Sequence, residues 1–122
     1  MRVVIVDDHP LARRGLSAIL SLEPYIEIVG EATNIEEAID VIKKEKPDLV
    51  MLDMALGSRN GLDVIKGVKR TGMSCKYIAL STVVDEDDFI GAEAEGINGF
   101  LLKDALPEEI LFAIRLVRNG RK

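Results

Sequence analysis

Polar side chains that could handle a phosphoryl group follow four separate apolar runs of the sequence. They are, in chain order, Asp7, Asp8, Asp53, Ser81 and Lys103. Carboxylates that lie close together repel one another, and a hard divalent cation with oxygen ligands, Mg²⁺ above all, offsets that repulsion. A carboxylate can accept a phosphoryl group as a nucleophile, while a hydroxyl and an ammonium group suit the phosphoryl oxygens. Together these residues predict a site for phosphoryl transfer.

Such a site requires that the apolar runs be strands whose ends meet at one edge of a sheet. Continuous apolar runs of about four residues suit a parallel sheet that is covered on both faces. Strands are expected over residues 3–6, 27–32, 49–52, 77–80 and 100–102. The five polar residues would then share the carboxyl edge of that sheet.

The segments that follow the strands have the apolar spacing of amphipathic helices. Helices are expected over residues 10–22, 35–44, 62–70, 86–95 and 107–119. Asn34 and Glu37 predict a capping box, and Asp85 suits an N-cap. Alternating strands and helices predict an α/β fold, namely a flavodoxin-like (βα)5 doubly wound parallel five-stranded sheet of order 2-1-3-4-5. This order makes the strands that precede Asp8 and Asp53 neighbours.

Composition narrows the classes of protein that fit. The chain has 122 residues, 48% of them apolar, which suits a single domain with one proper core. No segment approaches the run of about 18–20 apolar residues that a membrane helix needs, and no signal-peptide pattern opens the chain. Cys75 is the one cysteine, which fits a reducing cytoplasm. The net charge of −5 argues against this chain binding nucleic acid by itself.

The order and spacing of the five polar residues resemble the signature of receiver domains in two-component response regulators, along essentially the whole chain. The resemblance implies that Asp53 accepts a phosphoryl group from a sensor histidine kinase. It implies that Ser81 and Lys103 contact that group. It describes a signalling domain rather than an enzyme, with self-catalysed phosphotransfer and slow autodephosphorylation only.

The resemblance also implies a Mg²⁺ site and a switch. Asp8 and Asp53 would bind Mg²⁺ together with the backbone carbonyl of Ala55, and Asp7 would help through water. The hydroxyl of Ser81 would move toward the phosphoryl group, and the ring of Phe100 would swing inward behind it. The fourth helix, fifth strand and fifth helix would form the surface that changes. Homodimerisation through that surface on phosphorylation is a further hypothesis.

Two stretches resemble a particular subgroup of receivers. Asp7-Asp8-His9-Pro10 followed by an arginine pair, and the run at residues 99–104, are similar to receivers that are joined to a LuxR-type helix-turn-helix. We therefore expect residues 1–122 to be the receiver domain of a longer transcription factor. DNA would be bound only through a C-terminal domain absent from this sequence. A single-domain regulator is the alternative.

The sequence departs from the family pattern at a few positions. Leu56 and Gly57 stand where the family commonly has Met-Pro, and Gly57 is expected to loosen that loop. Asp104 replaces the proline of many receivers, in keeping with the LuxR-linked subgroup. Leu106 stands where that subgroup often has a capping serine, so the last helix is expected to start less firmly. None of these changes removes a reacting group.

Other functions on a similar fold fit less well. A phosphohydrolase of the haloacid-dehalogenase type needs Asp-x-Asp, and Asp53-Met54-Ala55 lacks the second acid. A flavin carrier needs a phosphate loop after its first strand, where Asp7 and Asp8 would repel phosphate. A degenerate receiver that works without phosphate conflicts with the intact set of five residues. His9 is expected to be a loop residue rather than a metal ligand, since the chain has no second histidine.

The residues at positions 55 and 83 predict a long-lived phosphorylated state. In the family, the positions two residues after the acceptor and two after the conserved hydroxyl influence how quickly water hydrolyses phosphoaspartate. Neither Ala55 nor Val83 can orient a water molecule. An Ala55→Asn, Val83→Glu double variant should therefore lose its phosphoryl group faster than the wild type, measured by following the phosphorylated mass over time. An unchanged or slower rate in the variant would contradict this reasoning.

Overall fold

The structure is a computed structural model that describes residues 1–82 and 86–120, apart from the side chain of Asp88. Val83 and Asp85, to which the sequence assigned roles, lie outside the described residues. The elements are, in chain order, β1 (Arg2–Val6), α1 (Pro10–Leu20), β2 (Glu27–Ala32), α2 (Ile35–Glu45), β3 (Leu49–Asp53), β4 (Ala55–Leu56), β5 (Arg59–Asn60), α3 (Leu62–Arg70), β6 (Lys76–Ser81), α4 (Glu86–Ala94), β7 (Gly99–Leu102) and α5 (Pro107–Arg118).

Five strands form a parallel sheet in the order β2-β1-β3-β6-β7. Counted along the chain without the short β4 and β5, this is the order 2-1-3-4-5 that the sequence predicts. Its middle strand β3 is buried along its full length, as the continuous apolar run predicts. The sheet therefore brings the carboxyl ends of β1 and β3 side by side.

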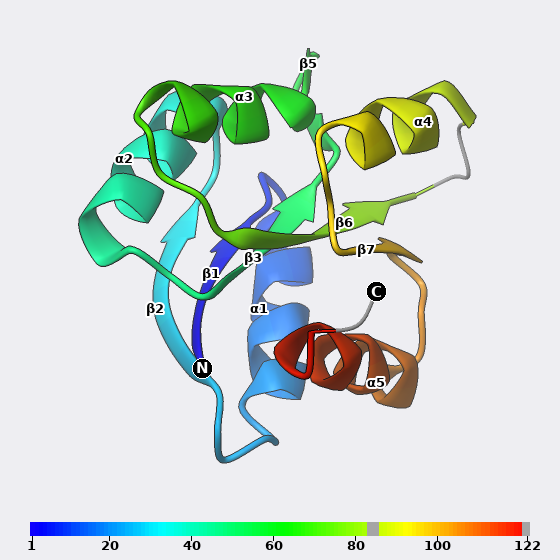
Figure 1. Cartoon of the computed structure of the whole chain (residues 1–122). Coiled ribbons are helices and arrows are strands. Elements are labelled where there is room, and N and C mark those ends of the chain that lie inside the picture. The colour runs from blue at the N-terminus through cyan, green and yellow to red at the C-terminus, as the bar shows by residue number, and fades with distance from the viewer. Residues whose placement is uncertain (83–85, 121–122) are drawn as a thin grey trace.

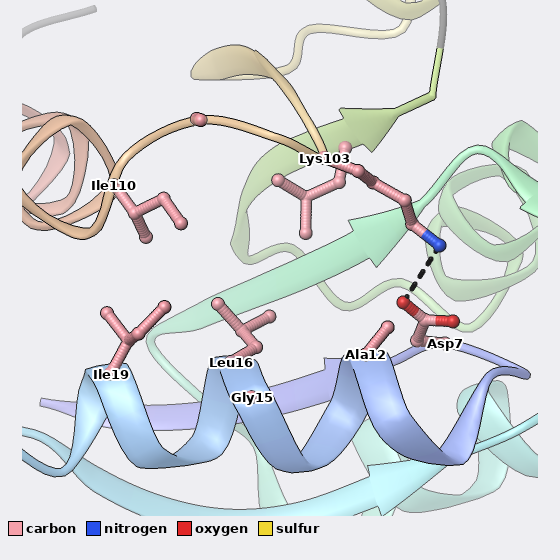
Figure 2. A pocket seen from close by; sticks show the side chains of 9 residues that line it. Asp7, Ala12, Gly15, Leu16, Ile19, Lys103 and Ile110 are labelled. Atoms are coloured by element: carbon pink, nitrogen blue, oxygen red, sulfur yellow. Dashed lines mark ion pairs between the residues drawn. The ribbon is translucent and has the colours of Figure 1, made fainter.

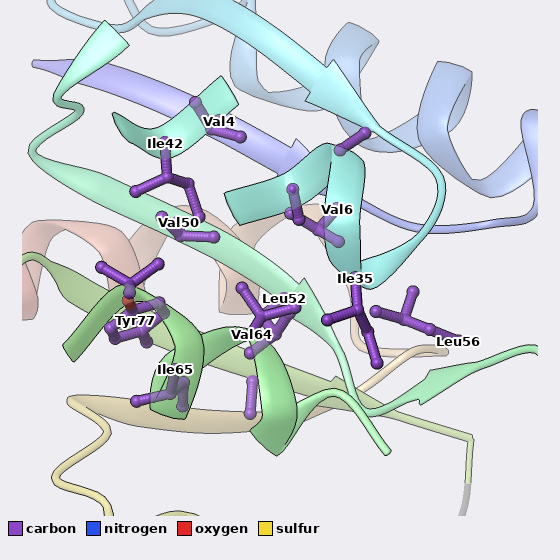
Figure 3. Close-up of a cluster of buried hydrophobic side chains, with 14 of the residues drawn as sticks. Val4, Val6, Ile35, Ile42, Val50, Leu52, Leu56, Val64, Ile65 and Tyr77 are labelled. Carbon is purple, nitrogen blue, oxygen red and sulfur yellow. The ribbon is translucent and has the colours of Figure 1, made fainter. Parts of the chain in front are cut away.

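Helices cover both faces of the sheet in three layers (Figure 1). On one face α2, α3 and α4 pack over an apolar cluster that includes Val6, Leu52 and Val64 (Figure 3). On the other face α1 and α5 enclose a second cluster that includes Ile5, Leu20 and Ile114. Both faces of each central strand are thus removed from water, which is the main stabilising contribution to this fold.

Backbone hydrogen bonds tie the strand ends together beyond the regular ladder. The amide of Asp7 donates to the carbonyl of Ala32 at 3.0 Å, which fixes the chain as it leaves β1. The amide of Lys103 donates to the carbonyl of Ser81 at 2.7 Å as the chain leaves β7. Backbone hydrogen bonds therefore fix the positions of Asp7 and Lys103, independently of the contacts that their side chains make.

The short hairpin β4–β5 was not predicted, and it corrects the expectation for Gly57. Ala55 pairs with Asn60 in this hairpin, and Leu56 with Arg59. Gly57 has a φ of 64° in the connecting turn, a value that favours glycine. Its amide donates to Asp8 Oδ2 at 2.8 Å, a bond that proline could not make. Gly57 therefore fixes this loop against Asp8 rather than loosening it.

The helix ends agree with the sequence to within two residues. At α2, Asn34 Oδ1 accepts from the amide of Glu37 at 2.8 Å, as the predicted capping box requires. The Glu37 carboxylate accepts a hydrogen bond from the amide of Thr33 at 2.9 Å, one residue before the Asn34 amide that a capping box would use. At α5, the Glu109 carboxylate accepts from the amide of Leu106 at 2.9 Å, so the helix start gains a contact that compensates for the absence of serine.

Replacing a glycine by alanine should have opposite effects on stability at two positions, Gly61 and Gly15. A Cβ on Gly61 would lie 2.3 Å from the backbone oxygen of Asp53, so the chain would have to move. A Cβ on Gly15, inside α1, would meet no atom within 4 Å. Gly61→Ala should lower the free energy of unfolding by about 1–3 kcal/mol through overpacking. Gly15→Ala should raise it by about 0.5–1 kcal/mol through the lower backbone entropy of the unfolded chain. Urea unfolding followed by circular dichroism measures both, and equal shifts would refute the packing around Gly61.

Candidate phosphoacceptor and metal site

The first acidic residue of the site, Asp7, is held by a backbone amide and by a side chain of α1. Asp7 follows β1 and is 2% exposed. Its Oδ1 accepts from the amide of His9 at 2.8 Å. Its backbone carbonyl accepts from Nη1 of Arg13 at 2.9 Å, while Nε of Arg13 donates to Glu31 Oε1 at 3.2 Å. The loop after β1 is therefore anchored from α1, and its two carboxylates have fixed positions.

Asp53 is the last residue of β3 and is 1% exposed. Its Oδ1 accepts from the amide of Ala55 at 3.0 Å, and its Oδ2 accepts from Nζ of Lys103 at 2.8 Å. One oxygen is thus held by the turn that follows the strand, and the other by a side chain from the far end of the chain. This arrangement fixes the orientation of a carboxylate that would otherwise rotate.

Lys103 links the two buried carboxylates. Its Nζ lies 3.0 Å from Asp7 Oδ2 and 2.8 Å from Asp53 Oδ2, and its side chain is 16% exposed. Figure 2 shows its long stem extending from the chain after β7 toward Asp7. Two buried carboxylates of like charge need such a cation, because the low local dielectric strengthens both their repulsion and their attraction to the ammonium group.

The electrostatic environment shifts the pKa values of the two carboxylates in opposite directions. Burial raises the pKa of Asp53, and the negative charge of Asp7 adds to that, although the hydrogen bonds from Lys103 and Ala55 oppose it. Burial also acts to raise the pKa of Asp7, but hydrogen bonds from the amide of His9 and from Lys103 outweigh it and hold the pKa below its usual value. Burial acts to lower the pKa of Lys103, yet its two carboxylate partners raise it overall. The ammonium therefore stays charged at neutral pH.

The acidic groups fit a hard divalent cation. Asp7, Asp8, His9 and Asp53 each offer a ligand atom, and these atoms all lie within 4.8 Å of one another. Asp8 Oδ2 accepts from the amide of Gly57, while its Oδ1 is buried and, among the described residues, has no hydrogen-bond partner. A buried carboxylate oxygen without a partner is costly unless a cation offsets its charge. The carboxylate oxygens are the ligand type that Mg²⁺ prefers.

The remaining predicted site residues lie around this cluster. Ser81 ends β6 and is 6% exposed, and its carbonyl accepts from the amide of Lys103. The amide of Ala55 contacts Asp53, whereas the proposed metal-binding role of its carbonyl stays a prediction. Phe100 lies on β7, with its ring centroid 5.4 Å from that of Phe89 on α4 and the rings at 74° to each other. The structure thus brings the predicted acids, lysine and serine to one edge of the sheet. Phe100 lies further back on β7, the strand that leads to Lys103.

Sequence reasoning missed two contributors. His9 lies in the loop between β1 and α1, as expected, and its Nδ1 also lies 3.0 Å from Asp7 Oδ1 and 2.9 Å from Asp8 Oδ1, a contact that sequence reasoning did not foresee. Arg13 anchors the carbonyl of Asp7, although the arginine pair had served only to indicate the subgroup. The signal for His9 was its position directly after two acids. Arg13 lies one turn into the helix, where a side chain can reach back toward the preceding loop.

A groove opens beside the site between α1 and the segment that leads from β7 to α5 (Figure 2). Its volume is about 210 Å³. Asp7 and Lys103 line one end, while Leu16, Ile19 and Ile110 give the rest an apolar wall. The groove therefore gives a small molecule a path along α1 to Asp7 and Lys103.

A doubly wound sheet with carboxylates after β1 and β3, and a lysine after β7, is the arrangement of a receiver-type signalling domain. The family model of the response regulator receiver domain matches residues 3–115. The chain accordingly belongs to the receiver domains of two-component response regulators. Receiver domains bind Mg²⁺ at an acidic pocket, and the cluster of aspartates described above is that pocket.

Individual relatives point to regulators of the LuxR family. The chain is 38% identical over 121 residues to the nitrate/nitrite response regulator protein NarP of Escherichia coli K12, covering 99% of this chain and 56% of that protein. The signal receiver domain of NarL from Mycobacterium tuberculosis has a TM-score of 0.90 at 34% identity, covering 98% of this chain and 97% of that one. A LuxR-family response regulator from Aurantimonas sp. SI85-9A1 has a TM-score of 0.92 at 25% identity, covering 99% and 86%.

This chain spans a little over half the length of the curated relatives, 55% of NarL and 56% of NarP from E. coli K12. The activities of those whole proteins therefore do not transfer to it directly. Among the described residues, every helix is too short or too polar to cross a membrane.

The raised pKa of Asp53 predicts how its removal changes stability with pH. In the folded protein Asp53 binds its proton more tightly than in the unfolded chain, so it stabilises the fold at low pH, and this contribution is lost as the pH rises through the folded pKa. In metal-free buffer the free energy of unfolding of Asp53→Asn, relative to the wild type, should therefore increase between about pH 4 and pH 7.

The matched control is Asp40→Asn, which changes an exposed acid on α2. Its difference from the wild type should stay flat over the same range when both are measured by urea unfolding. A flat difference for Asp53→Asn as well would show that burial does not raise the pKa of Asp53.

Proposed function

We propose that Asp53 accepts a phosphoryl group from a sensor histidine kinase and that the phosphorylated domain changes its α4–β7–α5 surface. The observation that supports this most strongly is the convergence of three aspartates and Lys103 at the carboxyl edge of β1 and β3. A structural ion pair would not need a third carboxylate, Asp8, beside two acids that already share one ammonium group. Catalysis of phosphoryl transfer needs this combination of nucleophile, anionic metal ligands and fixed positive charge.

The transfer step follows from the chemistry of the site. A carboxylate oxygen of Asp53 forms a bond to phosphorus, while the bond from phosphorus to the donor nitrogen or oxygen breaks and the donor leaves with its electron pair. Hydrogen bonds from Ala55 and Lys103 hold the carboxylate in position. Lys103 then pairs with the phosphoryl oxygens, and the hydroxyl of Ser81 donates to the same group. Asp8, Asp53 and the carbonyl of Ala55 would hold a Mg²⁺ ion, with Asp7 helping through water, and that ion would supply positive charge for the phosphoryl oxygens.

The switch that we propose depends on the pair of rings at Phe89 and Phe100. Phe100 contacts Phe89 edge to face in this structure. Movement of Ser81 toward a phosphoryl group would free space for Phe100 to turn inward, and that turn would break the contact with Phe89. The ring pair therefore favours the unphosphorylated conformation, and phosphorylation shifts the population away from it.

The output of this switch lies outside the chain. We infer that the receiver domain controls a C-terminal DNA-binding domain, since its relatives include LuxR-family regulators and it spans about half of their curated length. Phosphorylation would act through α4, β7 and α5, by releasing that domain or by pairing two receivers. Both routes use the same local change in charge.

Intact mass spectrometry tests the acceptor. Incubation of the protein with Mg²⁺ and acetyl phosphate should add one phosphoryl group to the wild type and none to Asp53→Asn. Chelation of the metal with EDTA should reduce the wild-type product by at least an order of magnitude, because the charge on the transferring group is then uncompensated. A folded wild type that gains no phosphoryl group with Mg²⁺ present would instead support a degenerate receiver that signals by binding alone.

Binding of beryllofluoride, a phosphoryl mimic, tests the ring pair. Phe89→Ala removes an edge-to-face contact worth about 0.5–1.5 kcal/mol, so the variant should bind beryllofluoride with Mg²⁺ about two- to tenfold more tightly. Calorimetric titration measures the affinity. The matched control is Phe112→Ala, which removes an exposed ring from α5 and should leave the affinity unchanged. Weaker binding by Phe89→Ala would contradict the proposed direction of the switch.

A further inference from the structure

His9 turns a ring nitrogen into the acidic cluster. It is the one histidine in the chain and directly follows Asp8. Its side chain is 60% exposed, yet Nδ1 lies 3.0 Å from Asp7 Oδ1 and 2.9 Å from Asp8 Oδ1. The same nitrogen lies 3.7 Å from Asp53 Oδ2 and 3.4 Å from Nζ of Lys103. The exposed ring is therefore anchored through the atom that faces the site.

The ring nitrogen of His9 makes a hydrogen bond with Asp7 Oδ1 at 3.0 Å, but among the described residues it makes none with Asp8. Asp8 Oδ1 is buried, and among the described residues it has no hydrogen-bond partner, although the ring nitrogen of His9 is 2.9 Å away. The two atoms approach each other without the angles that a hydrogen bond needs. Asp8 Oδ1 and His9 Nδ1 therefore lie close together without being joined, and in the tautomer that carries its proton on Nε2 the ring nitrogen could share a cation with Asp8.

The oxygens of the site divide into two sets. Lys103 contacts Oδ2 of Asp7 and Oδ2 of Asp53. The Oδ1 atoms of Asp7 and Asp8 lie instead on the side of His9. A cation on that side would leave the lysine contacts intact, so the two positive charges would use different oxygens.

The distances within the second set suit metal ligands. In an octahedral site with bonds of about 2.1 Å, neighbouring ligand atoms lie about 3.0 Å apart. The separation from His9 Nδ1 to Oδ1 of Asp8, a proposed metal ligand, is 2.9 Å. A neutral imidazole that carries its proton on Nε2 presents the Nδ1 lone pair to such a cation.

We propose that His9 Nδ1 is a ligand of the divalent cation in this site and makes the site selective for first-row transition-metal ions. An imidazole nitrogen favours ions such as Ni²⁺ and Zn²⁺, whereas Mg²⁺ prefers oxygen ligands. The site would therefore bind Mg²⁺ through its carboxylates and bind transition-metal ions more tightly through the added nitrogen. This inference deepens the proposed function by naming the class of ion, and it rests on that function only for the presence of a cation at the site.

The first experiment detects the nitrogen directly. Mn²⁺ is added to the tag-free protein, and electron spin echo envelope modulation records magnetic coupling between the bound ion and ¹⁴N. Because His9 is the sole histidine, an imidazole coupling can come from no other residue. The wild type should show this coupling, and His9→Asn should lose it while still binding Mn²⁺.

His9→Asn is a matched variant. Position 9 is the N-cap of α1, and asparagine is a favoured N-cap, so the helix should keep its start. Its amide oxygen is a hard ligand, which leaves binding of Mg²⁺ within about twofold of the wild type. The affinity for Ni²⁺ should fall by about tenfold or more, since the nitrogen ligand is gone. Asp8→Asn should weaken binding of both ions, which places them at this cluster.

The result that would overturn the proposal is equally specific. If Mn²⁺ binds in an Asp8-dependent way but shows no imidazole coupling, His9 is only a hydrogen-bond partner of Asp7. Equal loss of Ni²⁺ and Mg²⁺ affinity in His9→Asn would also reject selectivity. These measurements use the metals alone. Failure of phosphorylation by acetyl phosphate would therefore reject the proposed function without deciding whether His9 is a metal ligand.

Discussion

The contact between Lys103 and two buried carboxylates is the constraint on which the rest of the site depends. Asp7 and Asp53 are almost completely removed from water, and neither could stay ionised beside the other without a nearby cation. The ammonium group comes from the segment after β7, while the acids follow β1 and β3. Because β6 lies between β3 and β7, only a long side chain can cross that distance. The sheet order and the length of lysine are therefore both requirements of the same ion pair.

Around this contact the two sides of the site are built differently. On the acidic side, backbone amides of His9, Ala55 and Gly57 each hold one carboxylate oxygen, and Arg13 fixes the carbonyl of Asp7. On the other side, two aromatic rings contact each other between α4 and β7, and the proposed readout depends on them. Catalytic groups that are preorganised in this way need little rearrangement when charge develops. A fixed carboxylate near a ring that can turn is the combination that the proposed phosphorylation switch needs.

The fold was largely predictable because its elements carry strong local patterns. The continuous apolar runs of the central strands and the amphipathic spacing of the helices indicate each element without reference to its neighbours. Helix α1 ends two residues before its predicted end, at Leu20, where the chain turns toward β2. The hairpin of β4 and β5 was missed because strands of two residues are too short to have a periodic pattern. The turn of this hairpin is held by a hydrogen bond from the amide of Gly57 to Asp8, a contact between distant parts of the chain.

The sequence by itself singled out the residues that we propose to carry the chemistry and, through the alternation of strands and helices, determined the edge at which they meet. Its information is local, since residue type, spacing and periodicity describe each segment separately. Only the tertiary structure decided which oxygen faces which partner. It turned the ring nitrogen of His9 toward Asp7 and Asp8, and it gave Oδ2 of Asp53 to Lys103. Those choices depend on side-chain directions and on contacts between segments far apart in the chain, which packing of the whole domain fixes together.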